Sequence, residues 1–91
     1  MSTLVCRTVL IENKRGLHAR ASAKFVTMAS GLSCEVEVAK DGNKVVGTSI
    51  MGLMMLAAGI GDSIEISATG REAEAAVAKL TGLVIDKFGE E

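Results

Sequence analysis

The sequence predicts an α+β fold in which a four-stranded antiparallel sheet is covered on one face by three helices. Four short segments alternate apolar with polar residues, as strands with one buried face do, and three other segments repeat their apolar residues at helical spacing. The chain has 91 residues, no proline and 48% hydrophobic residues, which suits one core and leaves no room for a second. We therefore expect a single domain over residues 1–91 with the element order β-α-β-β-α-β-α.

The first strand and the first helix flank a short polar loop. Residues 5–11 alternate apolar and polar side chains closely enough to predict a strand. After the loop at residues 13–16, polar residues recur at helical spacing over residues 19–30, which predicts a helix ending at Gly31 in the C′ position. The expected buried stripe of this helix is Phe25, Val26 and Ala29.

The next three elements are short. Residues 34–38 alternate again and predict a second strand, and the turn signal Asp41-Gly42 predicts that residues 44–47 fold back as its hairpin partner. Residues 48–56 form an apolar segment that predicts a short helix. Its expected N-cap is Ser49, with Thr48 as the less favoured choice.

The last strand and the last helix complete the prediction. Residues 63–68 alternate with Ile64 and Ile66 facing inward. Thr69 and Glu72 have the spacing of a capping box before the final helix. The apolar face of that helix is expected to consist of Ala73, Ala76, Val77, Leu80, Leu83, Val84 and Phe88.

The composition argues against two classes of function. The net charge is −1 and the only aromatic residues are Phe25 and Phe88, whereas nucleic-acid-binding domains of this size usually have a basic excess and stacking aromatics. The apolar stretch at residues 50–60 is interrupted by glycine and is too short to span a bilayer, and the first residues lack a signal-peptide pattern. We therefore expect a cytoplasmic protein that binds no nucleic acid and does not insert into membranes.

The two cysteines, Cys6 and Cys34, do not have the spacing of metal ligands, and neither has a histidine near it in sequence. In the cytosol they would be buried or half-buried thiols. A metal site and a cofactor are therefore not expected, and a cysteine nucleophile has no support.

The segment Gly16-Leu17-His18-Ala19-Arg20 places the only histidine directly before the first predicted helix. A neutral imidazole is a good nucleophile, and the free amides and the positive dipole end of a helix start bind phosphoryl oxygens. If His18 is the N-cap, the amides of Ala19 and Arg20 lie closest to such a group, and the Arg20 guanidinium can add charge-assisted bonds. Gly16 would allow a tight turn into the helix, and Leu17 would anchor the loop in the core.

A plainer interpretation is that His18 only caps a helix and that Arg20 is one surface charge. Taken alone, the five-residue motif favours this plainer interpretation, because so short a motif is a weak signal. Its weight depends on whether other features occur with it.

Three features occur together. The block at residues 16–20, the segment Ser49-Ile50-Met51-Gly52 and the order of the elements resemble the active-site loop, the regulatory-serine segment and the open-faced β-sandwich of one family. This is the family of the histidine-containing phosphocarrier HPr, part of the phosphoenolpyruvate-dependent phosphotransferase system. The resemblance extends over nearly the whole chain, and the joint occurrence of the three features is specific.

The resemblance implies that His18 and Arg20 are the catalytic residues. His18 would accept a phosphoryl group at Nδ1 from the phosphohistidine of Enzyme I and pass it to a histidine of an EIIA-type protein, while Arg20 stabilises the charge in transit. Gly16, Ala19 and Arg20 would form the phosphate-binding site. Such a protein is a phosphoryl-transfer intermediate and not a stand-alone catalyst, and it is expected to be a monomer.

Ser49 resembles the regulatory phosphorylation site of the family, the target of an HPr kinase/phosphorylase. At a helix N-cap the added negative charge is favoured by the helix dipole, whereas it would oppose docking on an acidic partner. A plain capping serine is the alternative, because some members of the family carry a serine that is not a kinase substrate.

Partner docking is expected on the first two helices. The expected docking residues are Lys24 and Thr27 on the first helix and the apolar residues Ile50, Met51 and Met54 on the second. Leu53 and Leu56 are expected in the core instead.

One position departs from the family pattern, because Ala21 stands where the family usually has a proline. Alanine is compatible with a helix, so the helix start should survive. The rigidity of the loop, and whether Ser22 donates a hydrogen bond near the phosphate, are left open by the sequence.

The leading functional class is thus a phosphoryl carrier. The alternative is a purely regulatory binding module whose phosphorylation state is read by partner proteins without onward transfer. A nitrogen-related branch of the family shares the histidine, so the sequence supports phosphotransfer more strongly than sugar uptake. A hydrolase using His18 as a base is least favoured, because no serine, cysteine or carboxylate has a sequence position that places it beside His18.

Overall fold

The computed structural model describes residues 3–90, which form a four-stranded sheet and three α-helices in the predicted order. The elements are β1 (Leu4–Leu10), α1 (Ala19–Ser30), β2 (Glu35–Lys40), β3 (Asn43–Val46), α2 (Ile50–Met55), β4 (Ser63–Thr69), α3 (Ala73–Ile85) and a 3-10 turn, η1 (Lys87–Gly89). No helix within residues 3–90 is long and apolar enough to cross a membrane.

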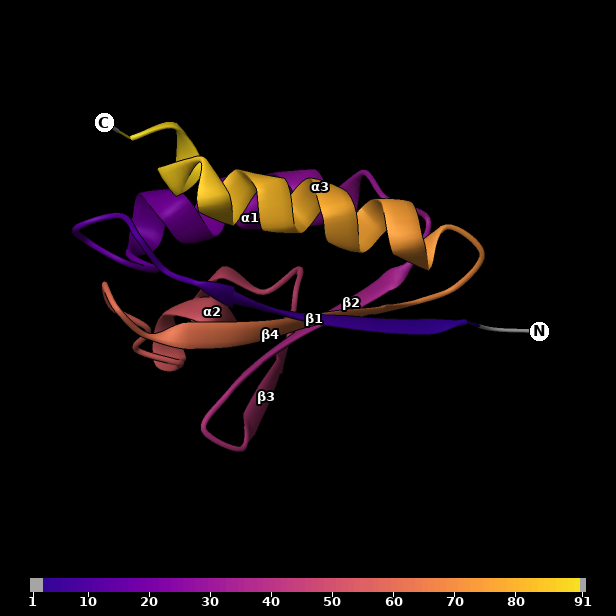
Figure 1. Cartoon of the computed structure of the whole chain (residues 1–91), viewed down its shortest axis with the longest axis horizontal. Helices are drawn as coiled ribbons and strands as arrows, with labels where there is room; N and C mark the ends of the chain where they lie inside the picture. Colours follow the sequence, from indigo (N-terminus) through magenta and orange to yellow (C-terminus); the bar gives the residue numbers. More distant parts are fainter. Residues whose placement is uncertain (1–2, 91) are drawn as a thin grey trace.

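The sheet is antiparallel throughout, with the strand order β1-β4-β2-β3. Ile64 of β4 faces Val9 of β1, and Ile66 of β4 faces Val38 of β2. α1 and α3 lie above the sheet in Figure 1, and α2 packs against α1 and β3. The open-faced α+β sandwich predicted from the sequence is therefore confirmed.

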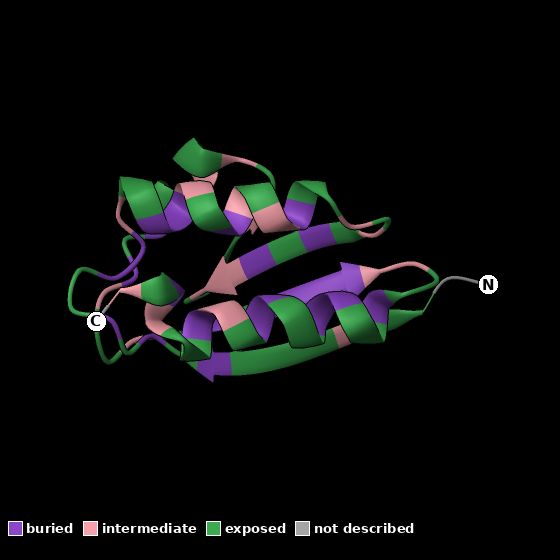
Figure 2. Cartoon of the chain, turned by 90° about the horizontal axis from the view of Figure 1, so that it is seen from above, coloured by how far each residue is buried: buried purple, intermediate pink, exposed green. Residues whose placement is uncertain are grey.

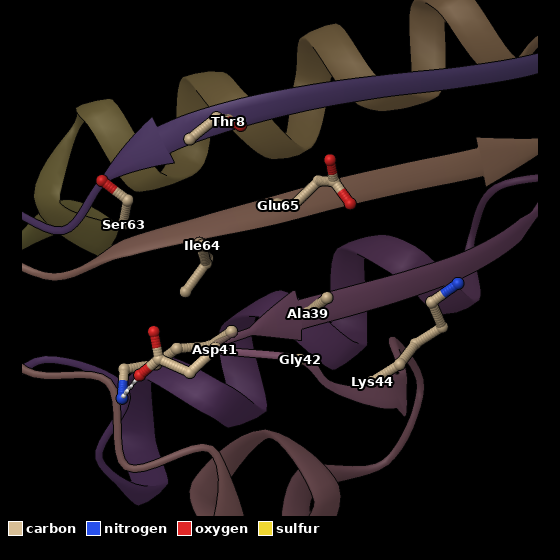
Figure 3. A pocket seen from close by; sticks show the side chains of 9 residues that line it. Thr8, Ala39, Asp41, Gly42, Lys44, Ser63, Ile64 and Glu65 are labelled. Carbon is tan, nitrogen blue, oxygen red and sulfur yellow. Dashed lines mark ion pairs between the residues drawn. The ribbon is translucent and has the colours of Figure 1, made fainter.

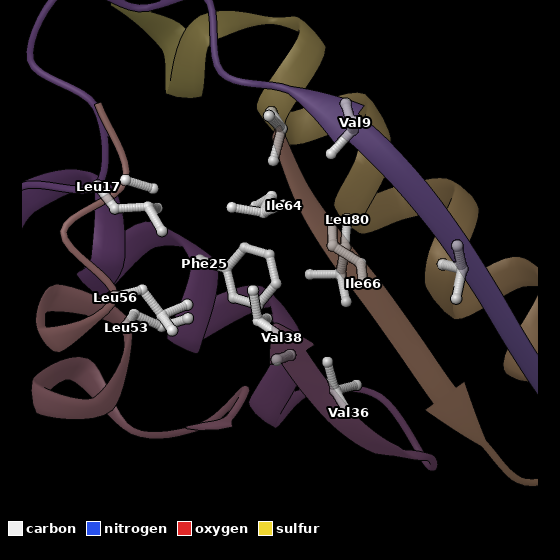
Figure 4. Close-up of a cluster of buried hydrophobic side chains, with 14 of the residues drawn as sticks. Val9, Leu17, Phe25, Val36, Val38, Leu53, Leu56, Ile64, Ile66 and Leu80 are labelled. Atoms are coloured by element: carbon white, nitrogen blue, oxygen red, sulfur yellow. The ribbon is translucent and has the colours of Figure 1, made fainter. Parts of the chain in front are cut away.

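The core lies between the sheet and the helices. Buried and exposed residues alternate along β2 and the first part of β4, whereas Val9 is the only buried residue of β1, and the buried sides of α1 and α3 face the sheet (Figure 2). Phe25 of α1 is fully buried near the middle of this cluster, with Leu53 and Leu56 on one side and Ile66 and Leu80 on the other (Figure 4). The prediction that Leu53 and Leu56 belong to the core is confirmed.

Two helices begin as predicted. His18 is the N-cap of α1 and accepts a hydrogen bond from the Arg20 N–H, and Ser49 is the N-cap of α2 and accepts one from the Gly52 N–H. Each side chain satisfies an amide that the helix itself leaves unpaired. The substitution at Ala21 therefore leaves the start of α1 intact.

Two predicted helix boundaries are wrong in detail. Thr69 is the last residue of β4, so its backbone belongs to the sheet and cannot cap α3. Glu72 is the N-cap instead and makes no side-chain capping bond, and the turn at Gly70, with φ of 142°, lies between the strand and the helix. Gly31 ends α1 as its C-cap with φ of −86°, so it does not use the left-handed conformation of a C′ glycine.

Phe88 does not lie on α3, as the sequence predicted, because that helix ends at Ile85. Lys87 and Phe88 both have φ of 57°, and this left-handed turn directs the fully buried Phe88 side chain back into the core. The Lys24 Nζ of α1 donates a hydrogen bond to the Phe88 carbonyl over 2.6 Å. The segment after α3 is thereby folded toward the same end of the molecule as the loop between β1 and α1 (Figure 1).

Candidate functional site

The loop between β1 and α1 is tied to the loop between α2 and β4. The fully buried Ile11 donates its N–H to the Asp62 carbonyl over 2.8 Å, and the buried Leu17 donates its N–H to the Ala58 carbonyl over 2.9 Å. Leu17 is thus the anchor that the sequence predicted. His18 directly follows Leu17, so this anchor also fixes the position of His18.

Gly16 makes the tight turn that the sequence predicted. Its φ is 63°, a conformation that side chains rarely adopt, and a Cβ at this position would lie 2.2 Å from the Ala58 carbonyl oxygen. Only glycine permits this close approach of the two loops.

The two ring nitrogens of His18 have different partners. Nδ1 accepts a hydrogen bond from the Arg20 N–H over 3.2 Å, and Nε2 lies 2.5 Å from a carboxylate oxygen of Glu90. An amide N–H can only donate and an ionised carboxylate can only accept, so the ring carries its proton on Nε2 and a lone pair on Nδ1. The histidine side chain is 17% exposed, which leaves it accessible from solvent.

Glu90 is the site residue that sequence reasoning missed. The prediction that no carboxylate lies beside His18 is therefore wrong: Glu90 lies 72 positions away in sequence, and the turn at Lys87–Gly89 returns the chain to the helix start. No sequence pattern at Glu90 signals this contact. Because its carboxylate faces Nε2, it orients the ring and leaves Nδ1 outside their contact.

Asn13 holds the Glu90 carboxylate in place by a hydrogen bond. The residue is 2% exposed, and its Nδ2 donates to Glu90 Oε1 over 3.1 Å and to the Gly16 carbonyl over 2.9 Å. Partial burial raises the pKa of Glu90, but the hydrogen bonds with His18 and Asn13, together with the positive charge of Lys24, outweigh it and hold that pKa below its ordinary value. The carboxylate is therefore ionised in the site.

Cationic side chains surround the histidine. A hollow of about 250 Å³ is lined by Lys14, Arg15, His18, Arg20 and Glu90. Within residues 3–90, no carboxylate lies at ion-pair distance from Lys14, Arg15 or Arg20. This excess of positive charge suits an anion such as a phosphoryl group. Lys14 and Arg15 were not singled out from the sequence, which drew attention only to Arg20.

Ser22 does not point to the site. Its side chain is fully buried, and its Oγ donates to the Leu17 carbonyl over 3.1 Å. This bond braces the residue before His18, and it answers the question that the sequence left open about Ser22. Ala21 beside it is also fully buried.

The residues predicted to dock partners form two groups. Lys24 and Thr27 line an apolar groove along α1 that also includes Arg20, Ala23 and Met28, and Leu83 of α3. Ile50, Met51 and Met54 are exposed on α2, and so is Met55, which the sequence did not single out. Ser49 lies at the start of α2 and does not line the hollow around His18.

A second hollow lies at the turn between β2 and β3, on the side of the sheet that carries Thr8 and Glu65 (Figure 3). Lys40 pairs there with Asp41 over 3.2 Å, and Lys44 lies 3.6 Å from Glu37. Its lining residues include no histidine or cysteine, and both lysines are paired. Of these two hollows, only the one at His18 combines a nucleophile with cations that have no ion-pair partner within residues 3–90.

Comparison with known proteins agrees with this geometry. The family model for the PTS HPr component phosphorylation site matches residues 5–86. The chain belongs to the HPr family of the phosphotransferase system. It is 49% identical to the phosphocarrier protein HPr of Neisseria meningitidis serogroup B over 92% of this chain and 94% of that protein. It is 39% identical to the phosphocarrier protein NPr of Shewanella violacea over 92% of each chain.

Solved structures of the family share the fold. The crystal structure of an HPr from Thermoanaerobacter tengcongensis matches with a TM-score of 0.91 and 45% identity, covering 96% of this chain and 98% of that one. A dimer of HPr from the same organism matches with a TM-score of 0.75 and 45% identity, over 90% and 94% of the two chains. The family match ends at residue 86, so Glu90 lies outside it.

Proposed function

We propose that this HPr-family protein carries a phosphoryl group on Nδ1 of His18, which it accepts from the phosphohistidine of Enzyme I and passes to a histidine of an EIIA-type protein. The observation that supports this most strongly is the asymmetry of the His18 ring. Nε2 contacts the Glu90 carboxylate, while the lone pair of Nδ1 faces the start of α1, near Arg20, which forms no ion pair within residues 3–90.

The transfer needs no further reactant. The Nδ1 lone pair attacks the phosphorus of the donor phosphohistidine, and the new N–P bond forms as the donor's N–P bond breaks, its electron pair returning to the donor ring. Before transfer, the Arg20 N–H donates a long hydrogen bond of 3.2 Å to Nδ1. After transfer, the Arg20 and Ala19 N–H groups donate to a phosphoryl oxygen instead. Passing the group to EIIA reverses these steps.

Arg20 has the main electrostatic role in this proposal. Its guanidinium lies in the first turn of α1, lines the His18 hollow and can bind two phosphoryl oxygens at once. The site is a shallow hollow at the surface, so two partners can approach it in turn. Gly16 contributes by holding the loop against Ala58.

Docking would use the surfaces on both sides of His18. The groove at Lys24 and Thr27 and the exposed α2 residues Ile50, Met51 and Met54 offer apolar area, while the nearby cations suit acidic partners. Methionine side chains adapt to different surfaces, which a carrier with two partners needs. We also propose that the protein is a single domain and acts as a monomer. Its proposed place of action is the cytoplasm, since its proposed partners act there.

Ser49 is proposed as a regulatory phosphorylation site for an HPr kinase/phosphorylase. Its Oγ accepts the Gly52 N–H over 2.9 Å and is half-buried at the N-cap of α2. A phosphate there would gain from the helix dipole and leave the fold intact, while adding negative charge beside the docking residues. Regulation would then be electrostatic.

Intact mass after incubation with phosphoenolpyruvate and an Enzyme I tests the proposal. We expect one phosphate, lost after brief acid treatment because phosphohistidine is acid-labile, and none on His18→Asn, which keeps a capping side chain but lacks the ring. Label on His18→Asn, or label stable to acid, would contradict the proposal. Addition of an EIIA-type protein should then remove the phosphate from His18. If the phosphate stayed on His18 after addition of EIIA proteins from both the sugar and the nitrogen-related branch, the regulatory binding module would be favoured instead.

A further inference from the structure

Residues 86–90 form a strap over the His18 site, held at three points. Phe88 is fully buried, its carbonyl accepts a hydrogen bond from Lys24 Nζ over 2.6 Å, and Glu90 reaches Asn13 and His18. The strap therefore brings a carboxylate to the histidine from a part of the chain outside the family match.

We propose that Glu90 and Asn13 are positioning residues that hold His18 in the tautomer with the proton on Nε2, so that Nδ1 is the nucleophile. Glu90 acts directly, through its 2.5 Å contact with Nε2. Asn13 acts through Glu90 and through the loop, since its amide spans Glu90 Oε1 and the Gly16 carbonyl. The functional consequence rests on the proposed phosphotransfer; the tautomer does not.

The hydrogen bonds of Asn13 explain why the residue at this position is an asparagine. Both protons of its Nδ2 group are used, one on a carboxylate and one on a carbonyl, so the site requires a donor of two hydrogen bonds. Its Oδ1 is buried with no hydrogen-bond partner within residues 3–90. Leaving an acceptor unpaired is costly, which indicates that the donor end determines the residue.

The carboxylate also suits the charge that transfer creates. When the Nδ1 lone pair bonds to phosphorus, the ring becomes an imidazolium that keeps its proton on Nε2. The negative charge of Glu90 faces that proton and stabilises the ring, with no proton moving between them. Once the phosphoryl group leaves, its bonding electron pair returns to Nδ1 and the neutral tautomer is restored.

The ¹⁵N chemical shifts of His18 test this directly, measured at a pH where the ring is neutral. In the unsubstituted protein we expect Nε2 to bear the proton. Glu90→Gln should populate the opposite tautomer, because its amide can donate to Nε2, and Asn13→Asp should do so in part, because a second carboxylate 3.1 Å from Glu90 drives it off the ring. Glu74→Gln and Asn43→Asp make the same changes at exposed positions and should leave the tautomer unchanged.

Transfer kinetics provide the second readout. Glu90→Gln should lower kcat for phosphotransfer from Enzyme I about tenfold with little change in KM, since it alters the nucleophile and not the docking surface. An unchanged tautomer in both site variants would overturn the proposal, and so would a tautomer change with unaltered kcat. Glu90 is half-buried, so Glu90→Gln should fold even if Asn13→Asp does not. If His18 were never phosphorylated, the tautomer measurement would still decide the positioning role.

Discussion

The loop that carries His18 and the helix that follows Ser49 differ in how tightly they are held. Around His18, side chains and backbone are joined by hydrogen bonds to Glu90, Asn13 and Ala58. α2 has six residues and exposes Met51 and Met55, which are 71% and 78% exposed. Phosphoryl transfer requires a ring with one orientation, whereas successive docking of two partners requires a surface that adapts.

Gly16→Val is the sharpest way to break the rigid side of this comparison. The Cβ would collide with the Ala58 carbonyl in a backbone conformation that valine avoids, so we expect a loss of about 2–4 kcal/mol in the free energy of unfolding and a displaced His18. Urea unfolding measures the loss. Gly31→Val is the matched control, because Gly31 has a negative φ and its nearest neighbour would be 3.6 Å from the Cβ; an equal loss there would contradict the account.

Arg20→Gln tests the electrostatic side of the site. It keeps a long polar side chain but removes the charge facing the phosphoryl group, and we expect transfer from Enzyme I to slow about a hundredfold. Stopped-flow or quench kinetics measure the rate. Arg71→Gln removes the same charge from an exposed position before α3 and should transfer at the normal rate. Equal slowing in both variants would mean that net charge, and not position, is what matters.

Ser49 separates capping from regulation. Ser49→Ala removes the acceptor for the Gly52 N–H and should cost about 1 kcal/mol of stability with a normal transfer rate. Ser49→Asp should keep the cap and instead slow transfer by adding charge beside the docking surface. Thermal unfolding should therefore change only in Ser49→Ala and the transfer rate only in Ser49→Asp, and a normal rate for Ser49→Asp would remove the regulatory role.

The smallest expected effect concerns acid stability. Because the pKa of Glu90 is lowered in the folded protein, its contacts stabilise the fold above the unfolded-state pKa and lose that effect as pH falls through the folded-state value. The difference in Tm between the unsubstituted protein and Glu90→Gln should therefore shrink in acid. A Glu90 difference that grows in acid would contradict the assigned direction.

The sequence was informative where local pattern determines structure. The strands, the two capping residues His18 and Ser49 and the burial of Leu53 follow from alternation, capping chemistry and helical period. The predicted helix cap at Thr69 was wrong, because this residue pairs with a neighbouring strand in the sheet. The sequence also failed at Phe88, which keeps the helical period of α3 yet enters the core through a left-handed turn.

The site also has one part that the local sequence predicts and one part that it does not. Gly16, His18 and Arg20 are consecutive or nearly so, and their arrangement could be predicted from the start of one helix. Glu90 reaches His18 only because the strap folds back, and that return depends on the burial of Phe88 and on the bond from Lys24. Contacts made by distant segments leave no local pattern, so this half of the site required the structure.

The most direct measurement is the ¹⁵N–³¹P coupling of His18 after incubation with phosphoenolpyruvate and Enzyme I, which identifies the nitrogen bonded to phosphorus. We expect coupling to Nδ1, with Nε2 still bearing its proton opposite Glu90. Coupling to Nε2, or a protein that carries no phosphorus on His18, would contradict it.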